Sequence, residues 1–385
     1  MFETLSHIAL QQYWWIIVSV LAALLVFLMF VQGGQTLIYK LGKTDMERTM
    51  LINTLGRKWE FTFTTLVTFG GAFFASFPLF YATSFGGAYW VWMLILFAFI
   101  VQAVSYEYRS KPGNFLGKKI YEGFLFANGL MATIFIGTAV ASFFTGSPFK
   151  LNVLNQVLWE SPYRGLELVF NVGRYATFIN LSLGLAVFFL ARVLAVQFFM
   201  NTVDAEDITP RLKKSLVRNA LPFLFFFLFF LANLLLMKGY AVNPETGQIF
   251  MEPYKYLHNF LQMPLVLIIF IIGVLFVLMG IARPLMDYEQ CHTKGIWMSG
   301  IGTFLVVFTL FLLLGFNNTA FYPSYTDLQS SLTIQNASSS HYTLTAMSYV
   351  SLLVPFVFAY IWYTWRALTK KKITPEEMED ESHIY

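Results

Sequence analysis

The chain has 385 residues, of which 57% are hydrophobic, 19% are aromatic and only 12% are charged. This composition is too apolar for an ordinary soluble domain and indicates a membrane protein with several spans. The net charge of +4 is small and the basic residues are dispersed over short connections, which argues against nucleic acid as a partner. The single cysteine, Cys291, excludes an internal disulfide and a metal site built from cysteines alone.

The sequence contains nine apolar stretches that are close in length to the roughly 20 residues a helix needs to cross a bilayer. They cover residues 13–36, 60–83, 88–107, 120–144, 175–200, 217–238, 259–282, 296–316 and 343–366. Runs such as LPFLFFFLFFLANLLLM lack the alternation of β-barrel spans. We therefore expect an all-α polytopic membrane protein with about nine transmembrane helices. Residues 1–370 form its single transmembrane domain, and residues 371–385 a polar cytoplasmic tail.

Lys and Arg are concentrated in alternate connections, which predicts that these connections are cytoplasmic. The first three contain Lys40, Lys43, Arg48, Arg57 and Lys58; Arg109, Lys111, Lys118 and Lys119; and Arg211, Lys213, Lys214 and Arg218. The opposite connections carry only Lys150, Arg164, Arg174, Lys238 and Lys255. The N-terminus is therefore expected outside and the C-terminus in the cytoplasm. The long, aromatic outer connections 145–174 and 317–343 are expected to fold over the membrane face or against a partner.

The second apolar stretch carries polar and small residues along one side. At helical spacing Glu60, Thr64, Thr68, Gly71, Ala75 and Pro78 share a face, and most phenylalanines lie on the others. We expect this stripe to face protein and the phenylalanines to face lipid or packed neighbours. Close helix packing explains such a stripe, because small residues let backbones approach and threonines hydrogen-bond across helices. The alternative is a cytoplasmic proton path that starts at the Glu60 carboxylate and continues past Thr64 and Thr68.

Other ionisable residues lie near the cytoplasmic surface. Glu107 and Arg109 end the third stretch and Glu122 begins the fourth, so the three side chains are expected to gather near Glu60 as a charge cluster, exposed to solvent in the simplest interpretation. Arg192 differs because it lies well inside the fifth stretch. An unpaired guanidinium there costs at least about 2.5 to 3.5 kcal/mol, so Arg192 must reach the surface, form an ion pair, or contact a lipid or partner.

The histidines do not lie where a membrane protein would bind haem or copper. Such metals are normally held by histidines on transmembrane helices. His7, His258, His292, His341 and His383 all fall in connections, helix ends or tails. Phosphate-binding glycine loops and other common catalytic motifs are also missing from the sequence. The isolated chain is therefore expected to bind no haem or metal and to perform no redox chemistry.

Several segments carry a resemblance to a known family. They are GKTDMERTMLINTLGRKWE, TLVTFGGAFFASFPLFYATSFGGAYW, YEYRSK, GSPF and the region from SSLTIQNASSSHYT to the last apolar stretch. In this order they resemble subunit II of the cytochrome bd ubiquinol oxidases. The resemblance includes both ends of the chain, whereas residues of about 150 to 330 match mainly by hydropathy.

The resemblance implies a subunit of a quinol-oxidising, oxygen-reducing complex in the bacterial cytoplasmic membrane. It implies that haems and quinol oxidation belong to a partner, subunit I, and that this chain is a structural partner with a proton path at Glu60. Small accessory single-helix subunits, membrane lipid and a bound quinone or lipid are further expected contacts. The family's tyrosine-arginine-serine-lysine segment corresponds to Tyr108, Arg109, Ser110 and Lys111.

The chain departs from the family pattern at two positions. Val31 stands where an aspartate is expected late in the first span, and Gln102 stands where an arginine is expected near the end of the third. The resemblance therefore implies no proton role for Val31 or Gln102. A multi-helix secondary transporter is the main alternative function, although the inverted repeat and broken helices typical of transporters are not found in the sequence. A scaffold without a proton role is the third hypothesis, and it differs from the first only at Glu60.

Overall fold

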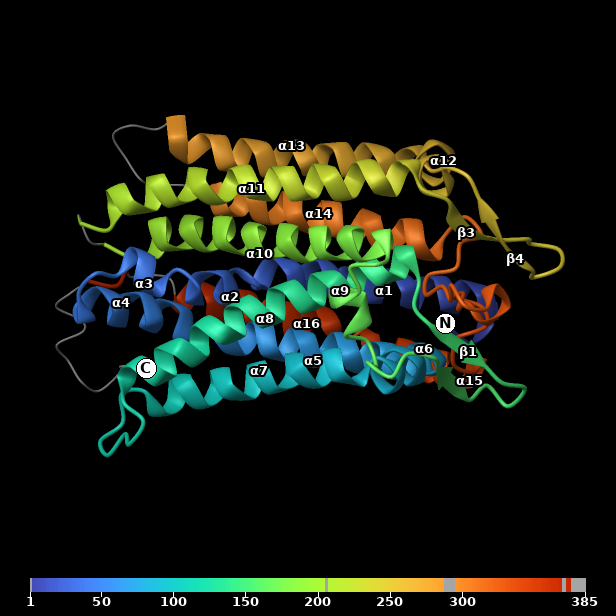
Figure 1. Cartoon of the computed structure of the whole chain (residues 1–385), viewed down its shortest axis with the longest axis horizontal. Coiled ribbons are helices and arrows are strands. Elements are labelled where there is room, and N and C mark those ends of the chain that lie inside the picture. The colour runs from blue at the N-terminus through green and yellow to red at the C-terminus, as the bar shows by residue number, and fades with distance from the viewer. Residues whose placement is uncertain (1, 205–206, 287–294, 369–371, 375–385) are drawn as a thin grey trace.

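The protein is a bundle of long helices that run roughly along one axis (Figure 1). The computed structural model describes residues 2–204, 207–286, 295–368 and 372–374; Cys291, His292, His383 and most of the predicted tail 371–385 lie outside these ranges. The long helices are α1 (His7–Leu28), α5 (Trp59–Ser76), α7 (Tyr89–Tyr108), α8 (Lys118–Thr145), α10 (Tyr175–Thr202), α11 (Thr209–Leu236), α13 (Pro264–Met286), α14 (Gly295–Gly315), α15 (His341–Ser351) and α16 (Val354–Leu368).

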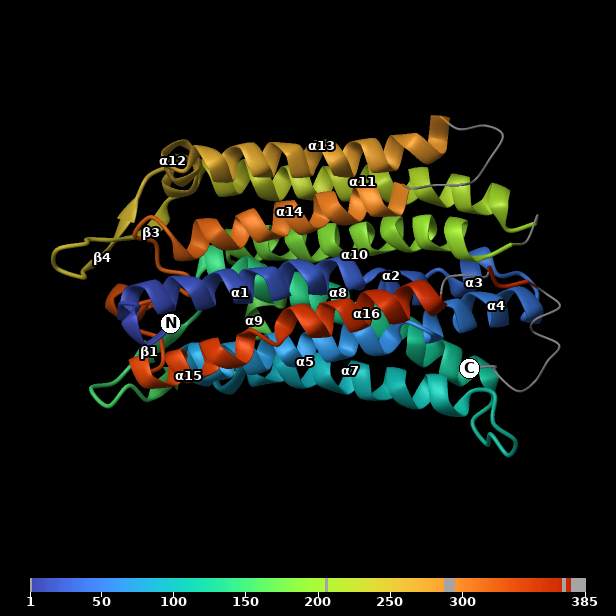
Figure 2. The same cartoon turned by 180° about the vertical axis from the view of Figure 1, so that it is seen from behind.

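Shorter elements connect these helices. The helical ones are η1 (Phe2–Thr4), α2 (Phe30–Gln35), α3 (Ile38–Leu41), α4 (Asp45–Gly56), α6 (Pro78–Tyr81), the π-helical turn η2 (Ala82–Gly87), α9 (Glu167–Phe170), α12 (Lys255–Gln262) and η3 (Leu328–Ser330). The strands are β1 (Phe149–Leu151), β2 (Val157–Trp159), β3 (Gly239–Val242) and β4 (Ile249–Glu252). The elements α3 and α4 lie at one end of the bundle, and the strands lie at the other (Figures 1 and 2).

Within the described residues, eight helical segments are long and apolar enough to cross a membrane. The all-α, many-span prediction is therefore confirmed. The predicted span 60–83 does form a helix, α5, but this helix is not among the eight. It ends at Ser76, and Pro78 begins α6 because proline, which has no backbone N–H, is favoured at the first position of a helix.

The two ends of the described part of the chain lie at opposite ends of the bundle. His7, at the start of α1, contacts the backbone oxygen of Ser339 in the outer connection through its Nε2 atom, at 3.0 Å. Ile373 forms a β-bridge with Val203, next to the turn between α10 and α11. This arrangement requires an odd number of crossings, as in the predicted topology with nine spans.

The central helix is α10, which packs against α2, α8 and α11. It is the most enclosed of the candidate spans, with 78% of its most apolar window buried. Glycines allow its closest approach to α8, because a Cβ atom on Gly137 would lie only 2.7 Å from the Cα atom of Gly184. Small residues of this kind let membrane helices pack backbone to backbone.

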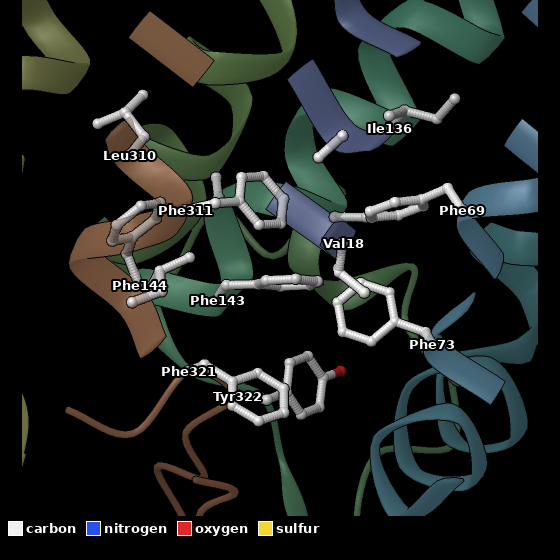
Figure 3. Close-up of a cluster of buried hydrophobic side chains, with 14 of the residues drawn as sticks. Val18, Phe69, Phe73, Ile136, Phe143, Phe144, Leu310, Phe311, Phe321 and Tyr322 are labelled. Carbon is white, nitrogen blue, oxygen red and sulfur yellow. The ribbon is translucent and has the colours of Figure 1, made fainter. Parts of the chain in front are cut away.

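Aromatic rings from α1, α5, α6, α8 and α14 and from an outer connection fill the outer half of the core, and Figure 3 shows part of this cluster. Phe73 of α5 lies 4.2 Å from Phe80 between ring centres, and Phe143 of α8 meets Tyr322 edge to face at 5.4 Å. The buried indole nitrogen of Trp15 donates to the backbone oxygen of Phe311 at 2.9 Å. The rings of Phe321 and Tyr322 therefore anchor the connection after α14 in the bundle.

The long connections at this end of the bundle fold onto one another. The strands β1 and β2 pair antiparallel with Phe149 opposite Trp159, and β3 pairs with β4 with Tyr240 opposite Met251. Isolated bridges join Ser147 to Ser324 and Ala241 to Thr319. Backbone hydrogen bonds therefore join these connections to one another.

Candidate functional site

The predicted stripe on α5 points away from the rest of the chain. The side chains of Glu60, Thr64 and Thr68 are exposed, and a Cβ atom on Gly71 would meet nothing within 4 Å. The opposite face carries the buried rings of Phe69, Phe73 and Phe77. The expectation that the stripe faces protein is wrong for this chain's own helices, because the large aromatic rings bury more apolar area in the core.

The threonine hydroxyls of the stripe are bonded to backbone, not to one another. Thr64 Oγ1 donates to the Glu60 carbonyl and Thr68 Oγ1 to the Thr64 carbonyl, each at 2.7 Å. Each threonine hydroxyl donates its single proton to a backbone carbonyl, and the Cβ atoms of side chains one helical turn apart lie about 5 to 6 Å from each other. A proton relay along this stripe would therefore need water molecules between its members.

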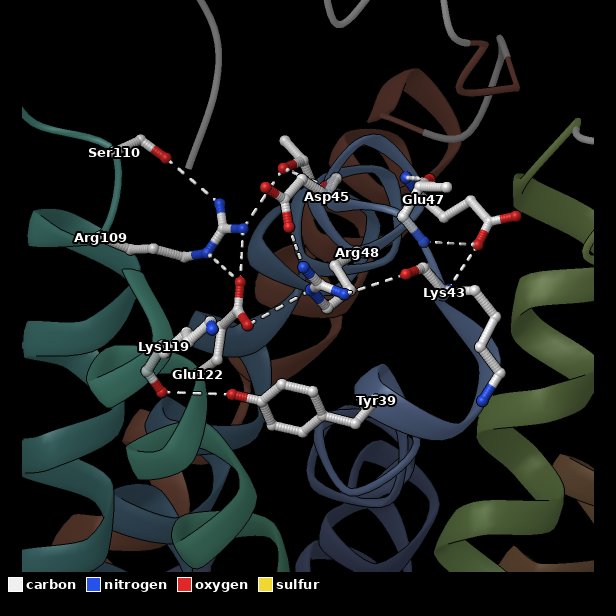
Figure 4. A network of polar contacts seen from close by, with 11 residues as sticks. Tyr39, Lys43, Asp45, Glu47, Arg48, Arg109, Ser110, Lys119 and Glu122 are labelled. Carbon is white, nitrogen blue, oxygen red and sulfur yellow. Dashed lines mark hydrogen bonds and ion pairs between the residues drawn. The ribbon is translucent and has the colours of Figure 1, made fainter. Parts of the chain in front are cut away.

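Arg109 and Glu122 form a buried ion pair at the predicted cytoplasmic end (Figure 4). The Glu122 Oε1 atom accepts from Arg109 Nη2 at 2.7 Å and from Arg109 Nε at 3.1 Å. Their side chains are only 1% and 3% exposed. The structure thus brings these two predicted residues together, in the interior and not in a solvated cluster.

Further contacts join this pair to α4. Arg48 Nε lies 3.5 Å from the second oxygen of Glu122, and Arg109 Nη2 donates to Thr49 Oγ1 at 3.3 Å (Figure 4). Glu107 is not part of this arrangement, because it is exposed and pairs with Lys111 at 3.3 Å. Glu60 forms no ion pair with any described residue. The pair and its contacts with Arg48 and Thr49 therefore hold α4, α7 and α8 together. The stripe on α5 takes no part in these contacts.

The sequence analysis did not predict Arg48 and Thr49 as site residues, although the sequence does indicate where α4 begins. Thr44 caps this helix, and the Glu47 side chain returns to the backbone N–H of Thr44 in a capping box. Glu47 also pairs with Arg211 at 2.5 Å, and this hydrogen bond is the largest of the effects that hold the pKa of the Glu47 carboxyl at about 2. The TDME sequence thus places Arg48 and Thr49 in the first turns of α4.

Lys58, immediately before α5, is a buried lysine. Its Nζ atom lies 4.3 Å from the centre of the Trp365 ring and donates to the Trp365 carbonyl at 3.4 Å. Burial is the main cause that lowers the pKa of this ammonium group to about 7, and the nearby charge of Arg57 acts in the same direction. A titratable cation therefore lies next to Glu60 in the chain, between α5 and α16.

The two departures from the family pattern fall in a buried set of neutral side chains. Gln32 Nε2 donates to Gln102 Oε1 at 3.1 Å, and Gln35 Nε2 donates to the Tyr106 hydroxyl at 3.1 Å. Val31 is also completely buried. This chain therefore has the amide of Gln102 where the family resemblance led us to expect an arginine, and Val31 where it led us to expect an aspartate. Neither side chain can exchange protons near neutral pH.

An apolar cavity lies between α1, α10, α11, α13 and α14. Thr303 is the one polar residue among those that line it, and its buried hydroxyl has no hydrogen-bond partner. The volume of about 60 Å³ is far below the roughly 150 Å³ of a cavity that holds benzene. A quinone ring would enter this cavity only if the helices moved apart.

The described histidines do not offer axial ligands for a haem inside the bundle. His258 Nδ1 lies 2.8 Å from Glu252 Oε1 in the outer connection, and His7 and His341 contact backbone oxygens at the same end. Haem in a membrane oxidase is usually held by histidines on the spans. The donor set in the described part of the chain therefore does not fit a haem site.

Comparison with known proteins identifies the family. Residues 10–368 match the sequence model of cytochrome bd terminal oxidase subunit II. The cytochrome bd-I ubiquinol oxidase subunit 2 of Escherichia coli (strain K12) is 27% identical, and the alignment covers 98% of this chain and 99% of that protein. The cytochrome bd ubiquinol oxidase subunit 2 of Bacillus subtilis (strain 168) is 31% identical over 38% of this chain and 43% of that protein.

A solved structure shows a similar fold. The bd oxidase from Geobacillus thermodenitrificans matches with a TM-score of 0.54 at 11% identity, and the match covers 93% of this chain and 97% of that one. At such low identity the likeness concerns the fold alone. The match to the family model, in contrast, extends over almost the whole sequence. The chain therefore belongs to the cytochrome bd terminal oxidase subunit II family.

Proposed function

We propose that this chain is the haem-free half of a respiratory complex whose haems and quinol-oxidation site belong to subunit I. Family membership makes the chain a subunit of a cytochrome bd-type quinol oxidase, and hence part of a quinol:oxygen oxidoreductase. The transporter alternative is not favoured by this match. The match over residues 10–368 carries the proposal, and the unsuitable histidine positions support the assignment of haem to the partner.

The partner would pack on the face formed by α5, α7 and α16. This face exposes the stripe of Glu60, Thr64 and Thr68, and it also exposes large side chains such as Phe97 of α7 and Trp362 of α16. Small and hydroxyl residues favour close contact between membrane helices, whereas aromatic side chains are enriched at subunit interfaces. An outward stripe of this composition fits a protein neighbour better than lipid tails.

The proton path would then run along the subunit interface and not through the interior of this chain. Reduction of oxygen to water consumes protons, and Glu60 lies at the end of α5 that the charge distribution assigns to the cytoplasm. The hydroxyls of Thr64 and Thr68 are spaced one turn apart, so ordered water trapped between the subunits would complete the path. A carboxylate in this position takes up protons from the cytoplasm and passes them toward the partner.

The remaining apolar faces would contact membrane lipid and small accessory single-helix subunits in the bacterial cytoplasmic membrane. The cavity beside Thr303 would take an acyl or isoprenoid chain more readily than a quinone ring, because its lining is apolar and its volume small. The oxidase assignment indicates aerobic respiration as the setting.

Co-expression with the haem-bearing subunit tests the proposal. The purified complex should show haem absorption bands and oxidise quinol with oxygen, and this chain purified alone should show neither. A stoichiometric haem in the isolated chain, ligated by its own side chains, would contradict the assignment of all haems to subunit I. Failure of the two chains to co-purify would contradict the oxidase assignment itself.

A further inference from the structure

Arg192 is a charged residue inside α10 that lacks a counter-ion in the described part of the protein. Its Nε atom is buried and has no hydrogen-bond partner. None of the ion pairs among the described residues includes it. The guanidinium carbon lies 5.1 Å from the centre of the Phe188 ring, so a cation–π contact is its main interaction. A charge in this position calls for an anion from outside the chain.

Two more cations lie near Arg192, on other helices. A Cβ atom on Gly33 would lie 2.5 Å from the backbone nitrogen of Arg192, so α2 touches α10 there, and Lys40 follows on α3. Burial lowers the pKa of the Lys40 ammonium group, and the charges of Arg192 and Arg218 lower it further. Neither Lys40 nor Arg218 belongs to an ion pair among the described residues. Three unneutralised positive charges therefore converge from α3, α10 and α11.

The two arginines lie at one depth in the bundle. Arg192 precedes the end of α10 at Thr202 by about 15 Å of helix rise, and Arg218 follows the start of α11 at Thr209 by about 14 Å. These helices pack antiparallel, so the arginines are level with each other (Figure 1). All charged residues of α11 precede Asn219, and the residues after Ala220 are apolar except Asn233. The cluster therefore lies at the boundary between headgroups and hydrocarbon.

An apolar surface continues from this cluster toward the other side of the membrane. On α11, Leu221 and Phe225 are 65% and 64% exposed, and Leu228 extends the same row. On α10, the partly buried Phe189 stacks on Phe226 of α11 with ring centres 6.0 Å apart. The cations lie at the headgroup boundary, and the exposed aliphatic and aromatic side chains follow them into the hydrocarbon region. A molecule with an anionic group and long apolar chains matches this combination.

We propose that Lys40, Arg192 and Arg218 bind the phosphate group of an anionic phospholipid whose acyl chains lie along the outer faces of α10 and α11. Guanidinium groups are suited to phosphate because they donate several hydrogen bonds in a fixed geometry, and the orphaned Nε of Arg192 supplies one of them. Basic pockets between membrane helices on the cytoplasmic side bind lipid headgroups of this kind. The site is independent of the proton path, because it lies on other helices.

Native mass spectrometry of the complete oxidase complex tests the site. The complex is equilibrated with phosphatidylglycerol, with phosphatidylcholine of the same acyl chains, or with inorganic phosphate alone. The wild type should retain phosphatidylglycerol in preference to phosphatidylcholine. Lys40→Gln and Arg218→Gln should each weaken this retention about fivefold, as expected for one basic residue at an anionic headgroup.

Controls separate the site from general charge effects. Lys118→Gln removes an exposed cation from α8 at the same end of the bundle and should leave phosphatidylglycerol retention unchanged. Arg192→Lys keeps the charge and should retain more phosphatidylglycerol than Arg192→Gln; the Lys40 and Arg218 variants decide the question if neither Arg192 variant assembles. Equal retention of both lipids, an equal loss in Lys118→Gln, or binding of inorganic phosphate as tight as that of phosphatidylglycerol would each overturn the proposal. An ion pair between Arg192 and a carboxylate of the partner subunit would overturn it as well.

Discussion

Arg109 donates two hydrogen bonds to the same oxygen of Glu122, at 2.7 Å and 3.1 Å, although both side chains are almost completely buried. Arg48 lies 3.5 Å from the other oxygen, so one carboxylate serves two guanidinium groups from α4 and α7. Because one carboxylate pairs with two guanidinium groups, loss of Glu122 and loss of one arginine should have different effects on stability. Glu122 is the only anion that pairs with Arg109 among the described residues, whereas Arg48 also pairs with Asp45.

Glu122→Gln should therefore destabilise the complex more than Arg109→Gln. The glutamate substitution leaves the buried Arg109 guanidinium without an anion, and loss of one partner of a buried ion pair typically costs about 3–5 kcal/mol. After Arg109→Gln the carboxylate still faces Arg48. Thermal unfolding of the purified complex measures both, with Glu107→Gln as the control, because an exposed pair contributes about 1 kcal/mol or less. Equal losses for Glu122→Gln and Glu107→Gln would contradict the structural role.

Lys58→Met should stabilise the complex, and more so at low pH. The ordinary lysine pKa of 10.5 falls to about 7 on burial, so between these values the unfolded chain binds a proton that the folded chain does not. Stability of the wild type therefore rises with pH across this window, and the cost of burying the charged ammonium is greatest below about pH 7.

Melting temperatures measured at about pH 6 and pH 9.5 test this titration window. The gain from Lys58→Met should be large at the lower pH and should shrink at the higher one. Lys118→Met changes an exposed lysine at the same end and should show no such dependence. A gain of equal size at both values would show that Lys58 is not titrating in the folded protein.

Glu60→Gln should slow quinol oxidase turnover without changing haem content or assembly. The amide keeps the size and hydrogen bonding of the carboxylate but cannot load and release a proton. Glu107→Gln is the matched control, since Glu107 is also exposed at the cytoplasmic end but pairs with Lys111. Turnover equal to that of the wild type across the pH range would leave the α5 stripe with a packing role only.

Gly71→Trp should reduce recovery of the complex, because the new ring would project from the face assigned to subunit I. The position has open space within this chain, so the substitution should not disturb the fold of the chain itself. Ile272→Trp places the same ring on the exposed face of α13 and serves as the control. The yield of co-purified haem-bearing subunit distinguishes the two, and normal assembly of Gly71→Trp would place the partner elsewhere.

The sequence predicted the helix count and the helix positions more fully than it predicted the buried Arg109–Glu122 pair. Long apolar runs located the spans, since a membrane helix must satisfy its backbone internally and expose apolar side chains. The residues of the pair were identified from their position at helix ends. Their burial was not predicted, because it depends on Arg48 and Thr49 of α4, which approach from a different part of the chain.

The sequence likewise predicted the amphipathic pattern of α5, but it did not predict which face of the helix points into the core. Periodicity shows that Glu60, Thr64 and Thr68 share a face and that Phe69, Phe73 and Phe77 lie on another. In a soluble protein the polar face would be outside by default, whereas in a membrane either face can meet protein or lipid. The ring contacts of Phe73 with Trp15, Phe80 and Phe143 decided which face entered the core.

The sequence by itself determined the class of protein, the approximate spans, the expected sidedness and the family, because these depend on local hydropathy, charge counts and ordered motifs. Only the tertiary structure decided that Glu122 is shared by two arginines, that Lys58 is buried beside Trp365, and that Arg192 lacks a counter-ion among the described residues. The physical reason is that these properties depend on distances and burial set by helices far apart in the chain. No local pattern encodes which groups meet when those helices pack.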